Sequence, residues 1–557
     1  MTTPLTPLRQ ARQELVEAHQ QLNELSQLVM SPGQFDLDQL QATAQRTREL
    51  RDAFKAGLEG YFVELDDGRQ IFPHQLEALK EFAGNNSIDV QELLPRITIE
   101  ERRVIHADLS CLDLKTLRGL SGVESINRID VSSNEWLTSL AGIPTQEIEE
   151  LYAGYCALSG DLSALTGATK LKWLLVSDNK DLTSLAGIPI QQIEGLNAAS
   201  CALSGDLSAL TGATKLKRLW VGGNRELTSL AGIPIQGIEE IEADCCGLAG
   251  DLSVLSGATK LKLLNVGGND QLTSLAGIPT QEIEELHAGY CALSGDLSAL
   301  TGATKLKGLW VGGNQHLTSL EGIPTQEIDT IDASGCGLEG DLSGLSRASK
   351  LRTLNIERNK TLTSLDGIPT QEIEEITADK CGLLGDLSAL AGATKLIRLS
   401  INGNRQLTSL LGIPTQGIEQ LEAYRCGLSG DLSALSGSKK LRLLDVSGNK
   451  KLTSLAGLPL QELEELNVSE CGLKGDLSVL TGATNLRHLH AWSNKSLTSL
   501  VGIPMKKIEQ IDAQRCKLSG DHNFLAQASA LLELNLSCNP SVSIDSSLFS
   551  KRVTIQV

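Results

Sequence analysis

Long hydrophobic runs are missing from this chain of 557 residues. No stretch approaches the roughly 18 consecutive apolar residues that a membrane-spanning helix needs, and the first twenty residues lack the apolar core of a secretory signal. We therefore expect a soluble, cytoplasmic protein without a membrane span. Export without a classical signal peptide is the alternative.

Positive charge is in the minority. The chain has 49 Lys and Arg against 68 Asp and Glu, which gives a formal net charge of -19. Proteins that bind nucleic acid need clustered positive charge to neutralise the phosphates. Nucleic acid is therefore not an expected partner.

The motifs of common active sites are missing as well. There is no glycine-rich phosphate loop, no HExxH and no GxSxG. His488 and His490 could begin a metal site with Asp512 or Asp445, but nothing nearby completes the ligand set. We expect no enzyme activity, no cofactor and no bound metal.

The sequence does contain a repeat that never slips. The segment NKDLTSLAGIP at Asn179 recurs every 45 residues, and a series of cysteines with the same period lies 22 or 23 residues from the asparagines, so that the structural unit is about half of 45. We call these asparagines and cysteines the marker residues. They are Asn179, Asn224, Asn269, Asn314, Asn359, Asn404, Asn449 and Asn494, and Cys156, Cys201, Cys246, Cys291, Cys336, Cys381, Cys426, Cys471 and Cys516.

Apolar residues stand at fixed places before each marker. The two patterns are LxxLxVxxNxxL, ending at Leu182, and IxxLxAxxCxL, ending at Leu158. They closely resemble the leucine-rich repeat consensus, LxxLxLxxN/CxL, over about residues 104 to 557. The resemblance implies an α/β solenoid, a right-handed leucine-rich repeat horseshoe or arc of about 20 turns built on a 45-residue double repeat, with a parallel sheet on its concave face.

Within a unit, each kind of residue has an expected place. The marker Asn should turn its amide inward to bond the backbone of adjacent turns. Asp161 of the GDL motif should cap a short helical turn, whereas Gly187 and Pro189 favour an extended return, which predicts a thin outer layer. Marker cysteines two turns apart lie about 9.6 Å from one another, beyond the roughly 7 Å limit for a disulfide, so they should be reduced and buried.

Residues 1–100 do not repeat and resemble no family. We predict a mainly helical N-terminal domain over 1–100 and a solenoid with its terminal caps over 101–557. The apolar spacing from Leu8 to Val29 predicts one helix, and a second is predicted over 37–58. A hairpin about Asp67 and helices near 74–82 and 90–94 should follow. This domain would cap the solenoid, dimerise or dock.

Outward strand positions carry the variation. Seven residues before the marker, cysteine units carry an acid and asparagine units mostly a base, as at Glu149 and Lys172. Neighbouring parallel strands lie about 4.8 Å apart, so the signs should alternate along one row of the sheet. Each exposed pair contributes at most about 1 kcal/mol, which indicates a structural role.

The positions six, four and two residues before the marker are the candidate binding surface. Aromatic anchors beside carboxylates are typical of protein-binding hot spots. Gly222, Gly267 and Gly312 should leave shallow depressions beside the rings; alternatively, the rings pack across strands merely to cover the sheet. The candidate partner-binding residues are Tyr152, Trp173, Leu175, Trp220, Glu240, Glu242, Asp244, Glu285, His287 and Trp310.

These features predict a scaffold for protein–protein interaction. It would be a monomer and would bind, on its concave face, a partner protein with a basic or mixed-charge segment, steered by the acids and anchored by the rings. The alternative is a secreted effector or adhesin of a microbe that recognises a host or cell-surface protein.

Overall fold

The computed structural model describes residues 13–21, 37–58 and 62–557. The chain divides into two compact units. The first unit comprises Met1–Ala202 with Ala209–Leu216, and the second unit comprises Leu203–Ser208 with Lys217–Val557. Each is described by itself.

The first unit begins with helices. Residues 13–21 are helical and bury Ala18, and α2 (Leu37–Leu58) buries Thr47. The second predicted helix is thus confirmed, whereas much of the first, including Leu8 and Val29, lies outside the described residues. The predicted hairpin is confirmed by β1 (Val63–Glu64) and β2 (Gln70–Ile71), which pair antiparallel.

The next segment leads into the parallel sheet of the first unit. It comprises α3 (Pro73–Asn86), α4 (Val90–Leu93), η1 (Leu94–Arg96), β3 (Ile97–Glu100) and β4 (Arg103–Asp108), which confirms the two short helices predicted there. On α3, the buried Gln75 donates to Ser125 Oγ at 2.6 Å and accepts from the Val104 amide at 2.9 Å. These bonds join α3 to the first turn. A domain boundary at residue 100 stays a prediction.

Parallel strands of three residues form the main sheet of each unit, one strand in each turn. In each of these strands the middle residue faces the interior and its two neighbours point outward; the middle residue is buried in β5 to β40 and half-buried in the last strand, β42. After β4, the first unit contributes β5 (Arg128–Asp130), β6 (Glu150–Tyr152), β8 (Trp173–Leu175) and β10 (Gly195–Asn197). The second unit contributes β12 (Arg218–Trp220), β14 (Glu240–Glu242), β16 (Leu263–Asn265), β18 (Glu285–His287), β20 (Gly308–Trp310), β22 (Thr330–Asp332), β24 (Thr353–Asn355), β26 (Glu375–Thr377), β28 (Arg398–Ser400), β30 (Gln420–Glu422), β32 (Leu443–Asp445), β34 (Glu465–Asn467), β36 (His488–His490), β38 (Gln510–Asp512), β40 (Glu533–Asn535) and β42 (Thr554–Gln556).

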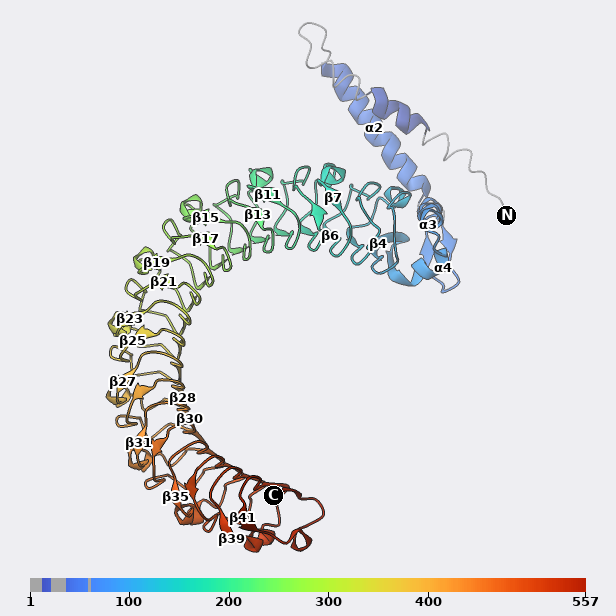
Figure 1. Ribbon diagram of the computed structural model, residues 1–557. Helices are drawn as coiled ribbons and strands as arrows, with labels where there is room; N and C mark the ends of the chain where they lie inside the picture. Colours follow the sequence, from blue (N-terminus) through green and yellow to red (C-terminus); the bar gives the residue numbers. More distant parts are fainter. Residues whose placement is uncertain (1–12, 22–36, 59–61) are drawn as a thin grey trace. The chain divides into compact units, whose positions relative to one another are not determined.

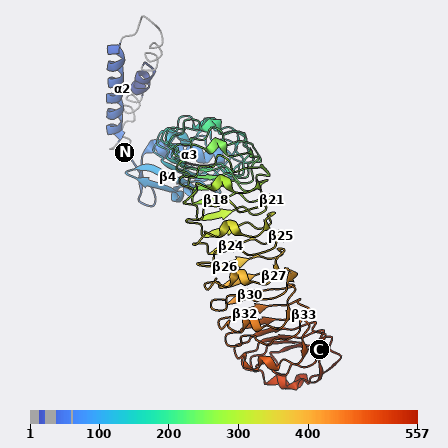
Figure 2. The same ribbon diagram turned by 90° about the vertical axis from the view of Figure 1, so that its left-hand side faces the viewer.

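The predicted solenoid of about 20 turns with a parallel sheet is confirmed. In the second unit the main sheet lies on the inner, concave side of the curve, as β28 and β30 show in Figure 1. Two-residue strands such as β27 (Leu384–Gly385) and β31 (Ser429–Gly430) lie on the outer side. Figure 2 shows the two sets as separate columns, with β24, β26, β30 and β32 in one and β25 (Thr361–Leu362), β27 and β33 (Lys451–Leu452) in the other.

The outer layer is thin, as predicted. In most turns of the GDL type it consists of a two-residue strand such as β7 (Ser159–Gly160) and a 3-10 turn such as η3 (Ser163–Leu165). β7 pairs with the two-residue strand of the next turn, β9 (Asp181–Leu182). The Asp161 carboxylate accepts from the Ser163 amide at 2.9 Å, and this backbone bond holds the pKa of Asp161 below its ordinary value. Asp161 therefore bonds the first amide of the turn, as predicted, but from one residue before the N-cap position, which is Leu162.

The marker asparagines bond the backbone of adjacent turns, as predicted. Asn269 donates through Nδ2 to the carbonyls of Ala243 at 2.9 Å and Val266 at 2.7 Å, and its Oδ1 accepts from the Leu248 amide at 3.0 Å. Its side chain is fully buried. The same set of bonds recurs at Asn314, Asn359 and Asn404, so it forms a ladder through the interior of the second unit.

The marker cysteines occupy the alternate rungs. The thiol of Cys246 donates to the Val221 carbonyl at 3.3 Å, and burial raises its pKa to about 11. All twelve cysteines are free. The prediction that every marker cysteine is buried is wrong for Cys201, Cys291 and Cys516, which are partly exposed because the marker lies at the turn that leaves the sheet, at the margin of the core.

The last strand of the second unit is β42, which pairs parallel with β40. It confirms the strand predicted from the alternation of Val553, Ile555 and Val557. No helix within the described ranges combines the length and the apolar character needed to cross a bilayer.

Candidate functional site

The alternating row of charges seven residues before the markers is confirmed. Lys307 Nζ lies 2.6 Å from a Glu284 carboxylate oxygen, and Arg442 lies 2.9 Å from Glu464. These hydrogen bonds lower the pKa of Glu284 and Glu464 and raise that of Lys307. The row thus joins neighbouring turns at the edge where the strands begin.

A second row, nine residues before the markers, runs beside the first. Lys350 pairs with Glu327 at 2.6 Å and Lys395 with Glu372 at 2.5 Å. Sequence analysis missed this row, although the same count at an offset of nine would have found it. The two rows together make this edge a nearly neutral lattice of ion pairs.

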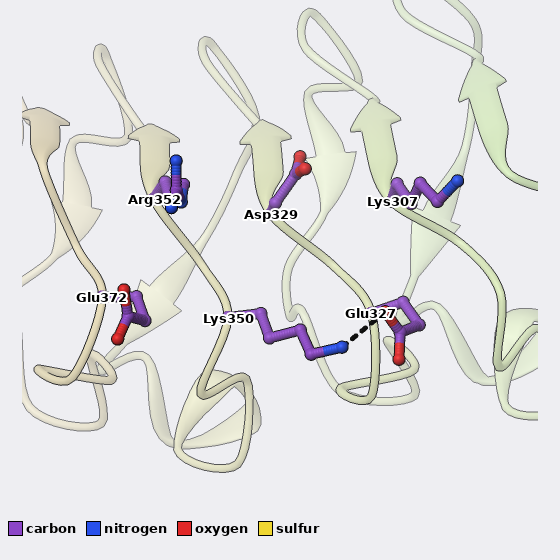
Figure 3. A pocket seen from close by; sticks show the side chains of 6 residues that line it. All are labelled: Lys307, Glu327, Asp329, Lys350, Arg352 and Glu372. Carbon is purple, nitrogen blue, oxygen red and sulfur yellow. Dashed lines mark hydrogen bonds and ion pairs between the residues drawn. The ribbon is translucent and has the colours of Figure 1, made fainter.

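One depression of about 270 Å³ interrupts the lattice at Asp329. Asp329 stands where the other cysteine units carry Glu, and it is shorter by one methylene. Its neighbours pair elsewhere: Lys307 turns to Glu284, and Arg352 lies 3.7 Å from Glu374. Figure 3 shows Lys307 extending away from Asp329. The depression is lined by Lys307, Glu327, Asp329, Lys350, Arg352 and Glu372.

Three of the predicted site residues belong to the first unit. The Tyr152 hydroxyl donates to Glu150 at 3.0 Å, and the Arg128 guanidinium lies over the Tyr152 ring, 5.0 Å from its centre. The Trp173 ring covers Gly195 of the next strand so closely that a Cβ there would collide with it. Leu175 lies beside Tyr152 in register. These side chains form one group on β6 and β8.

The other seven predicted residues belong to the second unit, where two of them form a flat stack. The rings of His287 and Trp310 lie parallel, with 4.1 Å between centroids and 2° between planes. The Trp310 ring also covers Gly308, which is buried beneath it. Burial lowers the pKa of His287, which favours the neutral imidazole. Glu285, two residues before His287, is exposed.

The remaining four lie on β12, on β14 and just beyond β14. The Trp220 indole donates to Glu240 at 3.0 Å. Glu242 stands between Glu240 and Asp244 at alternate positions of one turn, so all three carboxylates face outward. Burial, and then the charges of Glu240 and Asp244, raise the pKa of Glu242. The turn therefore holds three carboxylates, of which Glu240 also lies 3.5 Å from the Arg218 guanidinium on the neighbouring strand.

The strand register brings these seven residues onto one surface. Trp220 lies beside Glu242, and His287 beside Trp310, with Asn265 between the two pairs. From β12 to β20 this row crosses about 19 Å, at about 4.8 Å a strand. We call the seven residues the aromatic tract: Trp220, Glu240, Glu242, Asp244, Glu285, His287 and Trp310.

The alternative in which the rings pack on one another across strands does not describe Trp220 and Trp310, because three strands separate their own. It does describe His287 and Trp310, which stack on neighbouring strands. Of the depressions predicted at Gly222, Gly267 and Gly312, two are filled, since a Cβ at Gly222 would collide with Asp244 and one at Gly312 would lie 2.8 Å from the Ser334 hydroxyl. At Gly267 a Cβ would lie 3.3 Å from the Gly289 carbonyl oxygen. The glycines that matter to the rings stand six residues before the markers.

Sequence analysis also missed a row of residues immediately before the markers. They have positive φ, as at Cys245 (52°) and Tyr290 (55°), because the chain turns out of the sheet there. Tyr290 is 77% exposed and its ring leans over Gly313, where a Cβ would come within 2.7 Å of it. Its aromatic side chain among glycines was the signal.

The outward positions from β26 to β30 are different in character. The Asp379 carboxylate accepts hydrogen bonds from the Ser400 hydroxyl at 2.7 Å and from the backbone amide of Asn402 at 2.8 Å. The Asn402 side chain donates to Glu422 at 3.0 Å and accepts from the Tyr424 amide at 2.8 Å. We call Asp379, Ser400, Asn402 and Glu422 the polar tract. Its polar groups bond mainly to one another.

No group of three or more His, Cys, Asp or Glu side chains is placed to hold a metal ion in the part of the chain that the structure describes. His488 lies 3.7 Å from Glu509, and His490 lies beside Asp512 in register.

No protein-family model and no curated protein sequence matches the chain. Among solved structures, the chain is similar to a TDR receptor, with 18% identity, 81% of this chain and 88% of the other covered, and a TM-score of 0.47. It is also similar to a leucine-rich repeat protein of Leptospira interrogans, with 14% identity, coverage of 78% and 96%, and a TM-score of 0.45. A third is the Arabidopsis receptor kinase HAESA in complex with the peptide hormone IDA and the co-receptor SERK1, with 20% identity, coverage of 85% and 96%, and a TM-score of 0.40.

Proposed function

Since the chain is a leucine-rich-repeat-like solenoid with an aromatic and acidic surface on the inner sheet of its second unit, we propose that it is a protein-interaction scaffold. The partner is a protein with a basic or mixed-charge segment. Flat rings anchor such segments, and carboxylates steer them. The Tyr152, Trp173 and Leu175 group of the first unit is proposed as a separate contact.

The observation that carries the proposal is the carboxylate crowding beside the rings. Three carboxylates stand on one turn, and burial, followed by the charges of Glu240 and Asp244, raises the pKa of Glu242. A basic partner side chain would relieve this repulsion. The stack of His287 and Trp310 gives the same partner a rigid flat contact.

Affinity capture with the full chain tests the proposal. The variant Trp220→Ala with Trp310→Ala should lose capture of the partner while keeping its thermal transition, because both rings lie on the solvent-facing side of the main sheet and not in the core. Trp136 is 64% exposed and belongs to no strand, so Trp136→Ala is the matched control and should bind as the parent does. Unchanged capture by the folded double variant would reject the surface.

A reducing compartment and a monomeric state are part of the proposal. Twelve free thiols favour the cytoplasm, where such thiols stay reduced. Fractionation of the producing cells tests the location, and light scattering coupled to size-exclusion chromatography tests the monomer. Recovery of the protein from the medium would favour the alternative of an exported effector or adhesin.

A further inference from the structure

Positive charge collects along the edge at which the strands β24 to β38 end, in the second unit. Ten exposed Lys and Arg side chains stand one residue before, or one or two residues after, the markers from Asn359 to Cys516. This concentration is unexpected in a chain with a net charge of -19. We call these residues the basic rim: Arg358, Lys360, Lys380, Arg405, Arg425, Lys450, Lys451, Lys495, Arg515 and Lys517.

Two of the rim side chains, Arg425 and Lys380, lie along the edge over a neighbouring turn. Arg425 comes within 4.0 Å of Glu470, two turns away, so its side chain spans the turn between them. That turn has Gly448 at the matching position, where a Cβ would lie 2.5 Å from the Arg425 side chain. Lys380 leans over Gly403 in the same way, at 3.1 Å. The absence of a side chain at Gly403 and Gly448 thus lets these two cations extend over the next turn.

Most of this charge is uncompensated. Where the strands begin, cations such as Arg442 pair with an acid of the next turn. At the rim, within the described part of the chain, carboxylates reach Arg358, from Glu357 at 3.6 Å, and Arg425, from Glu470. The other eight cations have no ion pair there. The two edges of one sheet therefore differ: the first is neutralised and the second is positive.

We propose that the basic rim binds an acidic polypeptide segment in an extended conformation. From the turn of Asn359 to the turn of Cys516 there are seven turn spacings, which at about 4.8 Å each make about 34 Å. This is the length of about ten extended residues. A polypeptide is favoured over a phosphate polymer, because a long polyanion would run beyond the rim onto a protein of net negative charge.

This surface is distinct from the aromatic tract and has the opposite charge. A scaffold with both could hold a basic segment on its inner sheet and an acidic segment on its rim. The two assignments fail separately, since the Trp220 and Trp310 rings are not part of the rim and no rim residue is part of the aromatic tract.

Fluorescence anisotropy with the full chain and a labelled peptide of about twelve glutamates tests the proposal. The peptide should bind saturably at low salt and weaken as salt screens the charges. In the rim variant, Gln replaces four cations that stand one residue after a marker asparagine, a position where the chain itself has Gln315. It should bind at least about tenfold more weakly. The four substitutions are Lys360→Gln, Arg405→Gln, Lys450→Gln and Lys495→Gln.

The matched control replaces four lysines on the opposite edge of the sheet with Asn. They stand nine residues before a marker asparagine, a position where the chain itself has Asn485. This control should keep the parent's affinity for the peptide. Equal weakening in rim variant and control, with unchanged thermal transitions, would overturn the proposal, as would no binding at low salt. Tighter rim-dependent binding of a single-stranded oligonucleotide would also overturn it, in favour of a phosphate polymer. The control substitutions are Lys260→Asn, Lys305→Asn, Lys350→Asn and Lys395→Asn.

Discussion

In the aromatic tract, three carboxylates stand on one turn, and one of them, Glu240, is contacted by the Trp220 indole and by Arg218. In the polar tract, the Asn402 amide bridges Asp379 and Glu422, so each carboxylate accepts a hydrogen bond from a neighbour. Both tracts belong to the second unit and are built on the same buried ladder. The difference teaches that the interior of this solenoid fixes the turn, while the outward positions either complete one another or are left for a partner.

The first way to break this comparison is to damage the shared interior. Asn269→Ala beneath the aromatic tract and Asn404→Ala beneath the polar tract each remove bonds to two carbonyls and one amide. Each substitution should lower the free energy of unfolding by about 3 kcal/mol, because buried backbone groups lose their hydrogen-bond partners. Amide hydrogen exchange at Leu248 and Leu383 measures the loss locally. A cost differing between the sites by several-fold would show that the interiors are not equivalent.

The next largest effect on stability is expected from displacing the Trp310 ring, and this effect should be confined to the aromatic tract. Gly308→Ala places a Cβ where the Trp310 ring lies, so the ring must leave His287. We expect a cost of about 1 kcal/mol and a red shift of tryptophan fluorescence. Thr330→Ala, at the same offset one turn on, is the control and should leave the spectrum unchanged. If Gly308→Ala does so too, the stack does not depend on that glycine.

A buried hydroxyl marks a smaller difference between the turns. Ser438 is fully buried and its Oγ has no hydrogen-bond partner, whereas the same offset holds Ala258 beneath the aromatic tract. Ser438→Ala should raise the free energy of unfolding by about 1 kcal/mol, and Ala258→Ser should lower it by a similar amount. Chemical denaturation measures both. A loss of stability in Ser438→Ala would mean that the hydroxyl has a partner in solution.

The smallest effects are expected from replacing a single carboxylate. Glu242→Gln and Glu464→Gln should each change the free energy of unfolding by less than about 1 kcal/mol, with opposite signs at neutral pH. Burial and like charges raise the folded-state pKa of Glu242, so its ionisation weakens the fold and Glu242→Gln should stabilise. The hydrogen bond from Arg442 lowers the folded-state pKa of Glu464, so Glu464→Gln should destabilise. The Glu242 difference should vanish once the pH falls below the ordinary pKa of 4.5, because that carboxyl is then protonated in both states. The Glu464 difference should persist to lower pH and vanish only below the lowered pKa of the folded state. Thermal unfolding against pH checks the signs.

The buried residues of each repeat could be predicted from the sequence because they recur at a fixed spacing. The place of every marker asparagine, the strand before it and the Asp161 cap all follow from spacing. The alternation of Lys307 and Glu284 follows in the same way, since adjacent strands stay in register.

The orientation of the outward-facing rings could not be predicted in the same way. Trp173 covers a glycine on the next strand, whereas Trp310 covers one on its own strand. The two tryptophans stand at different offsets from their markers, and the rotamer of each depends on where a neighbouring side chain is missing. Period alone does not carry that information. The basic rim was not predicted for another reason. The negative net charge of the whole chain does not reveal a local excess of positive charge.

The unbroken count of 45 residues between like markers makes the second unit a molecular ruler. Removing one 45-residue pair of turns between two outward groups would bring them closer by about 9.6 Å, and inserting one would move them apart by as much. Every new junction would join strands and ladder rungs of the kinds already present. Spacing between two bound partners could thus be tuned in fixed increments, by recombination between copies, without redesigning a single contact in the core.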